Sequence, residues 1–483
     1  PVDRPVTVES HDQFTRIFDL PGNNCRLGRI LHDFFAAGGI NAVIVRISGT
    51  SERARMYLPG PGGDLILEAR NPGASEFLRV AVDYDGIDPH EHQQFNLVLQ
   101  RLREPESAWI DNQECFRRVT VEPTSRDYIG YVLNQSELAM LAQEAPPSRP
   151  HATYATGTLR EPVYVNAVLD RIKQPPPADY DILGSEQAGT GLNALEHIVD
   201  LGQVCLLGGT PDGPGPVALL AADNFCRRHQ AMLLIEPPAR WDSVSAIMHD
   251  QTRRAFSSPN AMTWYPNLNA RTPEGSLMST SAMGGVAAAL AARCRPGIAQ
   301  LDTGISIAGK QGLRPAVELT TAEHQKLKRL GINVLTQSGP LHLRLEHGVT
   351  MLRNEVVSAN WQSLDTRCQT LMILRRIREA TRWTFFQRSD EDLWHELTQQ
   401  IADYLTELHA RSMLAGQHAA QAFFVKCDRE TNRVQAHKTG EVSLIVGFAL
   451  KQPGQFLSFR VQRADGACRI VELGWDSALE LAS

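Results

Sequence analysis

The local sequence pattern changes twice along this chain of 483 residues, and these two changes limit what it can fold into. Residues 1–55 show helical apolar spacing that leads into an almost unbroken apolar strand at 42–47. Residues 56–150 instead contain short strands between Gly, Pro and Asp clusters, and helix–strand alternation resumes after residue 190. Because such alternation is typical of layered α/β domains, the two outer segments are predicted to form one domain that carries the middle segment as an insertion.

These patterns predict an α/β fold with a three-layer core domain that is built from both chain ends and carries an inserted β-rich domain. Proline-rich stretches at 145–150 and 175–177 are typical of linkers or exposed loops. The predicted boundaries are 1–55 for the N-terminal part of the core, 56–150 for the inserted β-rich domain, 151–190 for a linker or crossover, and 191–483 for the C-terminal part of the core.

The C-terminal segment contains the elements that define the predicted sheet. Strands are predicted at 204–207, 232–235, 262–265 and 333–336. Helices are predicted at 216–228, 241–255, 279–294 and 321–330. This βαβ rhythm predicts a largely parallel sheet between two helical layers. Two long helices follow at 363–382 and 390–413, and then three strands near 421–427, 441–450 and 455–462.

Composition excludes several classes of protein. Hydrophobic residues make up 42% of the chain and charged residues 21%, which supports a folded core, and the formal net charge of -6 gives no basic footprint for nucleic acid. No apolar run approaches the roughly 18 residues of a membrane-spanning helix, and the first residues lack the pattern of a signal peptide. The eight cysteines stand singly with mostly apolar neighbours, so we expect buried free thiols formed in a reducing compartment.

The motifs that would carry chemistry are incomplete. The glycine-rich segment 208–215 follows a predicted strand, but it lacks the lysine of a phosphate-binding loop and contains prolines that cannot donate backbone hydrogen bonds. His90 and His92 flank Glu91, but Gln94 stands where a zinc-binding HExxH motif needs histidine. We therefore predict no catalytic residue, no metal and no cofactor. The alternative is a Rossmann-like α/β enzyme that binds a nucleotide or small molecule at the carboxyl ends of its strands.

The two long helices carry opposite charge. In the helix at 390–413, apolar residues recur every three or four positions, and the remaining face carries Asp392, Glu396, Asp403 and Glu407. The helix at 363–382 carries five arginines beside its apolar face. Two interpretations stay open at this point: solvated faces or an intramolecular pairing of the two helices, and charge-complementary contact with other subunits.

Several motifs occur together in one order along the chain. The N-terminal motifs are Phe-Phe-Ala-Ala-Gly-Gly at 34–39 and Ala-Val-Ile-Val-Arg at 42–46. The C-terminal motifs are Gly-Ile-Asn-Val at 331–334, residues 375–387 followed by Asp-Glu-Asp-Leu-Trp at 390–394, Ala-Phe-Phe-Val-Lys-Cys-Asp-Arg-Glu-Thr-Asn at 422–432, and Pro-Gly-Gln-Phe-Leu-Ser-Phe-Arg at 453–460. In this order, and over most of the length, they resemble the contractile tail sheath proteins of phages and phage-tail-like particles.

The resemblance implies a structural subunit and not an enzyme. Members of this family polymerise helically around an inner tube and contract to drive the tube through a target cell envelope. The implied partners are other copies of this chain, the inner tail tube protein, and baseplate and tail terminator proteins, with no nucleic acid and no membrane insertion. The implied location is a virion tail, or a phage-tail-like particle, that is assembled in the bacterial cytoplasm.

The resemblance also implies which residues touch neighbours. The helix at 390–413 is expected to face the tube, and the tube-contact candidates are Asp392, Glu396, Asp403 and Glu407. Extended arms of neighbouring subunits are expected to add strands to the sheet at 441–462, where the inter-subunit strand candidates are Val442, Leu444, Val446, Phe456 and Phe459.

The chain departs from the family pattern in three respects. It has no extended arm before Pro1, which predicts incomplete interlocking with neighbours. It continues past Arg460 into residues 464–473, which are expected to form either a hairpin or a C-terminal arm. It also lacks the usual Trp-Gly-Asn turn after Gly73, so the inserted domain is expected to differ from that of the family.

Overall fold

The computed structural model describes residues 2–18, 25–49, 51–73, 76–104, 107–154, 163–168, 175–210, 212–254, 256–271, 276–293, 305–308, 313–339, 342–353, 359–432, 441–464 and 467–473. The chain divides into two compact units. Unit 1 comprises Pro1–Val8, Asp12–Asn24 and Val43–Leu195, and unit 2 comprises Glu9–His11, Cys25–Ala42 and Glu196–Ser483. Each unit is therefore built from stretches that are separated in the sequence.

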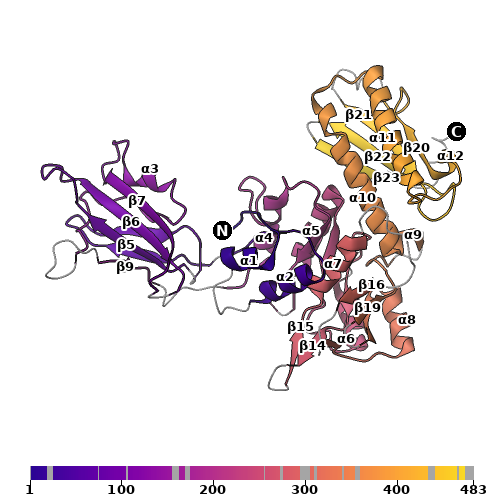
Figure 1. Ribbon diagram of the computed structural model, residues 1–483, viewed down its shortest axis with the longest axis horizontal. Helices are drawn as coiled ribbons and strands as arrows, with labels where there is room; N and C mark the ends of the chain where they lie inside the picture. Colours follow the sequence, from indigo (N-terminus) through magenta and orange to yellow (C-terminus); the bar gives the residue numbers. More distant parts are fainter. Residues whose placement is uncertain are drawn as a thin grey trace. The chain divides into compact units, whose positions relative to one another are not determined.

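Two antiparallel sheets form the β-rich part of unit 1 (Figure 1). The first sheet has the order β3-β4-β8, with strands Arg55–Leu58, Leu65–Ala69 and Ala139–Leu141. The second has the order β7-β6-β5-β9, with strands Ile110–Thr120, Gln94–Leu102, Leu78–Asp83 and Val165–Asn166. One apolar cluster contains buried side chains from both sheets, among them Met56, Leu67, Val80, Phe95 and Leu97. The two sheets therefore share a single core, as in a β-sandwich.

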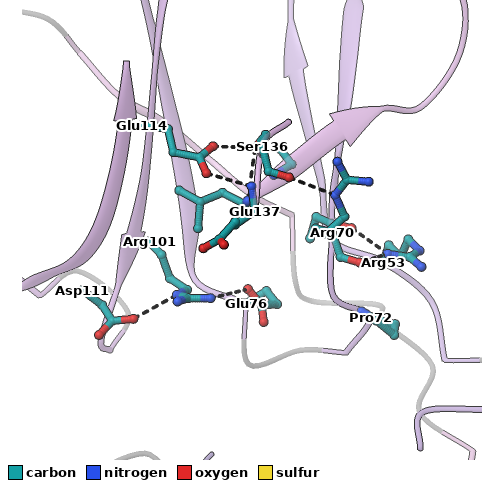
Figure 2. Close-up of polar contacts among 12 residues, drawn as sticks. Arg53, Arg70, Pro72, Glu76, Arg101, Asp111, Glu114, Ser136 and Glu137 are labelled. Carbon is teal, nitrogen blue, oxygen red and sulfur yellow. Dashed lines mark hydrogen bonds and ion pairs between the residues drawn. The ribbon is translucent and has the colours of Figure 1, made fainter. Parts of the chain in front are cut away.

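A polar network at the rim of this sandwich ties its loops to the strands (Figure 2). Arg101 on β6 pairs with Asp111 on β7 at 3.0 Å. Glu114 on β7 accepts a hydrogen bond from the Ser136 hydroxyl, and the Arg70 guanidinium donates to the Ser136 carbonyl at 3.1 Å. Ser136 precedes β8, so these bonds fix the connection from β7 to β8 against both sheets.

Short elements complete this part of the chain. They are β1 (Val6–Val8), paired with β2 (Ala42–Ile44), and α1 (His11–Ile17), α3 (Ile129–Leu133), α4 (Asp179–Leu183) and the 3-10 helix Gly191–Leu195.

The first sheet of unit 2 is parallel. Its order is β10-β11-β12, with strands Gln203–Leu206, Met232–Ile235 and Ala261–Met262. The strands are connected through α5 (Pro216–His229) and α6 (Val244–Arg254), so the predicted βαβ rhythm is confirmed here. α2 (Arg26–Ala36) packs against α7 (Met283–Arg293). A Cβ atom on Gly284 of α7 would lie 2.1 Å from the Ile30 carbonyl oxygen, so this close helix contact requires glycine.

Two further sheets show that the prediction of one largely parallel sheet is wrong. One has the order β13-β18-β19-β16, with strands Trp264–Tyr265, Asn333–Gly339, His342–Glu346 and Ile305–Ala308. The other has the order β15-β14-β17, with strands Leu277–Thr280, Leu268–Arg271 and Leu313–Pro315. Within these two sheets β13 and β18 pair in parallel, and the other described pairs are antiparallel. The short connection from β18 to β19 allows antiparallel pairing only. α8 (Thr321–Arg329) begins with a capping box of Thr320 and Glu323.

The predicted strand at 262–265 is divided between two sheets at Thr263. Met262 lies in β12 and Trp264 in β13. The buried amide of Asn333 donates to the carbonyls of Thr263 and Val349, at 2.9 Å and 2.8 Å. The Thr263 carbonyl thus accepts from both the side chain and, at 3.2 Å, the backbone N–H of Asn333 where the strand divides.

The helix α10 (Leu364–Ala380) takes part in two apolar cores of unit 2. Leu364, Cys368 and Leu371 pack into the cluster that contains the parallel strand β11. Ile373 and Ile377 pack into the cluster that contains the C-terminal sheet. The predicted long helix is confirmed, and it joins the two cores within one rigid element.

The C-terminal sheet has the order β20-β21-β22-β23 and is antiparallel (Figure 1). Its strands are Phe423–Lys426, Val442–Phe448, Leu457–Ala464 and Ala467–Leu473. The neighbouring helices are α9 (Ala359–Gln362), the 3-10 helix Arg382–Phe386, α11 (Glu391–Ala410) and α12 (Ala419–Ala422). Residues 467–473 therefore form a hairpin with β22, one of the two outcomes expected from the sequence.

The described cysteines are all free, but the prediction that they are buried is wrong for two of them. Cys115 on β7 and Cys205 on β10 are exposed. Cys226 and Cys368 are buried, and Cys294 lies outside the described residues. Among the helices of the described chain, none is long and apolar enough to cross a membrane.

Candidate assembly surfaces

The helix α11 separates an apolar face from an acidic one. It begins at the N-cap Asp390, whose side chain accepts a hydrogen bond from the Leu393 N–H at 3.0 Å. The buried face consists of Leu393, Trp394, Leu397, Ile401, Leu405 and Leu408. The four tube-contact candidates, Asp392, Glu396, Asp403 and Glu407, are all exposed. One face of α11 is thus anchored in the protein and the other presents carboxylates to solvent.

The arginines of α10 do not form ion pairs with this acidic face in the described contacts. Arg375 is buried and binds Asp200 at 2.8 Å, and Arg376 pairs with Glu379 at 3.2 Å. The Glu407 carboxylate instead pairs with Arg411, one turn further along α11, at 2.5 Å. The described contacts therefore show no pairing between the two charged helices. The acidic face of α11 stays available to a partner.

The inter-subunit strand candidates lie in the interior of the C-terminal sheet. Val442, Leu444, Val446 and Phe459 are each at most 3% exposed, and Phe456 is half-buried just before β22. β21 is paired with β20 and β22, and β22 is paired with β21 and β23. The backbone groups of these two strands are therefore used within the chain. The edges that this sheet offers to a further strand are those of β20 and β23.

The hydrogen-bond pattern defines what the β20 edge presents. The Ala449 N–H donates to the Ala422 carbonyl at 2.8 Å, and the register continues with Phe423 opposite Phe448. Because hydrogen-bonded and non-bonded pairs alternate in antiparallel sheets, the N–H and C=O groups of Phe423 and Val425 point away from β21. Within the described part of the chain, the β20 edge thus directs these backbone donors and acceptors away from the sheet.

The residues that follow β20 fold into a turn that extends the sheet. Asp428 accepts hydrogen bonds from the N–H groups of Glu430 and Thr431, at 2.9 Å and 3.0 Å. The Asn432 side chain then accepts from the Ser443 N–H at 2.7 Å and donates to the Ser443 carbonyl at 2.9 Å. Asn432 is only 2% exposed. The motif at 422–432 therefore has a structural explanation, in which an amide side chain takes the place of a strand residue opposite β21.

Other sequence motifs lie apart from one another. His90, Glu91 and His92 lie in an exposed turn of unit 1, and among the described residues no group of three or more His, Cys, Asp or Glu side chains is placed to hold a metal ion. A shallow cavity of about 500 Å³ in unit 1 is lined by Arg53, Arg55, Tyr57 and Glu68 among others. None of its lining residues comes from the parallel strands β10, β11 or β12, where a Rossmann-like enzyme would bind its ligand.

Known proteins support one interpretation of this fold. No protein-family model matches the chain, and no curated protein does either. Among solved structures, the sheath tail protein from Listeria innocua superimposes with a TM-score of 0.55 at 13% sequence identity, covering 96% of this chain and 92% of that chain. The sheath tail protein from Desulfitobacterium hafniense gives a TM-score of 0.50 at 12% identity, covering 96% and 94%.

The chain therefore has the fold of these sheath tail proteins. The likeness extends over both units and confirms, at the level of the fold, the resemblance that the sequence motifs indicated. A sheath complex of an extracellular contractile injection system in its contracted state is also similar, at 19% identity over 56% of this chain and with a TM-score of 0.42.

Proposed function

We propose that this chain is the sheath subunit of a contractile tail or tail-like particle. It polymerises helically around an inner tube and contracts to drive the tube through a target cell envelope. The observation that carries this proposal is the likeness in fold to two sheath tail proteins over 96% of the chain. In this role it is a structural protein without catalysis. Its core is built from both chain ends, and residues 56–150 form the inserted outer domain.

The proposed partners follow from the same role. They are other copies of this chain, the inner tail tube protein, and baseplate and tail terminator proteins, with no nucleic acid and no membrane insertion. The location is a virion tail or a phage-tail-like particle, with assembly in the bacterial cytoplasm. The test is co-expression with a tube protein followed by sedimentation. Co-pelleting as tubes supports the proposal, and a chain that stays in the supernatant while the tube polymerises contradicts it.

We propose that the acidic face of α11 contacts the tube. Four exposed carboxylates on an anchored helix form a surface that complements a basic partner and steers its approach. The double variant Glu396→Lys with Asp403→Lys cancels the net charge of the four carboxylates without touching the buried face. We expect it to lose co-pelleting with the tube. The matched control is Glu186→Lys with Glu318→Lys, which changes the same charge at exposed positions outside α11 and is expected to assemble normally.

We further propose that an extended arm of a neighbouring copy adds to the edge of β20. The support is the row of outward N–H and C=O groups at Phe423 and Val425. Val425→Pro removes an outward donor, whereas Val425→Ala removes side-chain packing but keeps the donor. Strand addition at β20 predicts that only the proline variant assembles poorly. Equal assembly of both variants would place the contact elsewhere.

The rival function is a Rossmann-like enzyme, and it has its own test. A nucleotide that binds the folded state raises the unfolding temperature in proportion to its affinity. We expect no shift with adenine or nicotinamide nucleotides at millimolar concentration. A clear, saturable stabilisation would favour the enzyme over the sheath subunit.

A further inference from the structure

β23 pairs with β22 at one edge of the C-terminal sheet, and buried arginines lie close to it. Arg367 projects from α10 toward β23 and is only 7% exposed. Arg463 on β22 is also buried, and its guanidinium donates to the Thr381 carbonyl at 2.9 Å. Burial lowers the pKa of Arg367 to about 10 and also lowers the pKa of Arg463. A buried arginine is costly unless an acceptor or a carboxylate compensates it.

Three groups surround the Arg367 guanidinium. Its Nε donates to Asn260 Oδ1 at 2.7 Å, and the guanidinium carbon lies 4.9 Å from the centre of the Trp361 ring. Among the described residues its buried Nη1 has no hydrogen-bond acceptor, and the carboxylate of Glu472 on β23 lies 3.7 Å from it. Asp223 is engaged elsewhere, by Arg227 at 2.9 Å. The compensation of Arg367 by an ion pair therefore comes from the edge strand.

The apolar pattern of β23 does not by itself fix its register. Cys468 and Ile470 face the helices and pack against the same core as β22. They stand opposite Arg463 and Val461. Because side chains repeat every second residue along a strand, a slip of two residues returns the same face to the core. Glu472, which stands opposite Phe459, is the feature of this face that such a slip would displace.

We infer that Arg367 determines the register of β23. Its ion pair favours the register of the segment 467–473 in which the Glu472 carboxylate stands opposite Phe459. The occupant of the edge beside β22 is this chain's own C-terminal strand, which the structure places there through seven residue pairs from Ser458–Leu473 to Ala464–Ala467. A single buried polar residue can specify the register of a coiled coil at a cost in stability, and we extend this reasoning to the buried Arg367 beside a strand. The inference does not depend on the sheath role, since it concerns the folded subunit alone.

Disulfide trapping in the full-length chain reports the register directly. Gln462 and Arg469 are exposed and stand opposite each other, so the pair Gln462→Cys with Arg469→Cys traps the native register. Val471 is also exposed, and a slip of two residues would bring it opposite Gln462. The pair Gln462→Cys with Val471→Cys therefore traps the slipped register. The single-cysteine variants control for the native Cys468.

The two reporters are then combined with Glu472→Gln and with Arg367→Met. We expect each substitution to slow trapping of the native pair by about fivefold and to increase trapping of the slipped pair, as loss of a half-exposed ion pair would. The exchange of charges, Arg367→Glu with Glu472→Arg, is expected to restore part of the native trapping. Because Glu472 is 41% exposed on its side chain, Glu472→Gln leaves a folded chain even where Arg367→Met does not.

Two results would overturn the inference. Native trapping that is unchanged in Glu472→Gln, with no gain in the slipped pair, would show that the hairpin sets its own register. A disulfide that joins two chains in the native reporter, seen as a dimer on a non-reducing gel of the unassembled protein, would show that β23 is not held by its own subunit.

Discussion

The β-sandwich of unit 1 and the C-terminal sheet of unit 2 are both antiparallel, but they stabilise their cores differently. The sandwich places two sheets around one apolar cluster, and its ion pairs, such as Arg101 with Asp111, lie at the rim. The C-terminal sheet is covered by α10 and α11, and α10 buries Arg367 and Arg375 beside its apolar residues. The sandwich thus packs around an apolar core with polar contacts between its strands and loops, whereas the second region buries arginines of a helix beside its apolar core.

The largest expected effect concerns packing in the sandwich. Leu67 is fully buried, so Leu67→Ala should lower the stability of unit 1 by about 2–5 kcal/mol through lost burial and the cavity left behind. The measurement is urea unfolding monitored by hydrogen exchange, which reports the protection of each unit separately. Ile110→Ala, at a 44% exposed position on β7, is the control and should have little effect. If unit 2 lost protection to the same degree as unit 1, the two regions would not be independent.

A smaller effect is expected from a buried charge on α10. Arg375→Met removes hydrogen bonds to Asp200 and to the Gln230 carbonyl, at 2.8 Å and 3.1 Å. Hydrogen bonds to charged groups contribute about 1.5–3 kcal/mol, so unit 2 should lose stability of that order. Arg376→Met is the matched control, because the Arg376 side chain is 53% exposed and its ion pairs contribute less than about 1 kcal/mol. Equal losses in the two variants would mean that burial of the charge is unimportant.

Acid should weaken unit 2 through a buried histidine. Burial lowers the pKa of His229, although Glu196 at 3.3 Å opposes the shift. The unfolded chain then binds a proton that the folded chain does not, so stability falls as the pH drops below about 6.5, the value for a free histidine. The loss is complete below the lowered pKa of the folded state. His229→Asn should flatten this pH dependence. The measurement is urea unfolding at several pH values, monitored by the hydrogen-exchange protection of unit 2. An unchanged slope would mean that other groups cause it.

The smallest effect on stability is expected at the surface of α11. Glu396→Lys with Asp403→Lys changes exposed side chains, so unfolding should shift by no more than about 0.5 kcal/mol per site. The same double variant is expected to abolish tube binding. A large loss of stability would mean that the acidic face has a structural role, which would remove the main support for its proposed contact with the tube.

Local patterns predicted much of this fold because they depend on neighbouring residues. The 3.6-residue period of the sequence at α11 by itself separates the buried face from Glu396 and Asp403. The predicted helix at 363–382 and the strand at 441–450 lie within a few residues of α10 and β21. The sheath fold was also within reach, since its motifs are distributed over both chain ends.

Long-range pairings were not predicted, because no local pattern encodes them. The strand at 441–450 was expected to receive a neighbour, yet the chain itself supplies partners on both of its sides. The pairing of Arg367 with Glu472 joins residues that are far apart in the sequence, as does the hydrogen bond from the Asn333 side chain to the Thr263 carbonyl. The single parallel sheet failed for a similar reason, since the hairpin of β18 and β19 reverses the direction of the chain.

We propose above all that this chain forms a contractile sheath. The most direct measurement is electron cryo-microscopy of particles assembled from the full-length protein with its tube protein. The account predicts a helical layer of this chain around the tube, with α11 on the inner surface and a shorter, wider layer after contraction. Particles in which the tube is bare, or in which density for this chain lies only outside any helical layer, would contradict it.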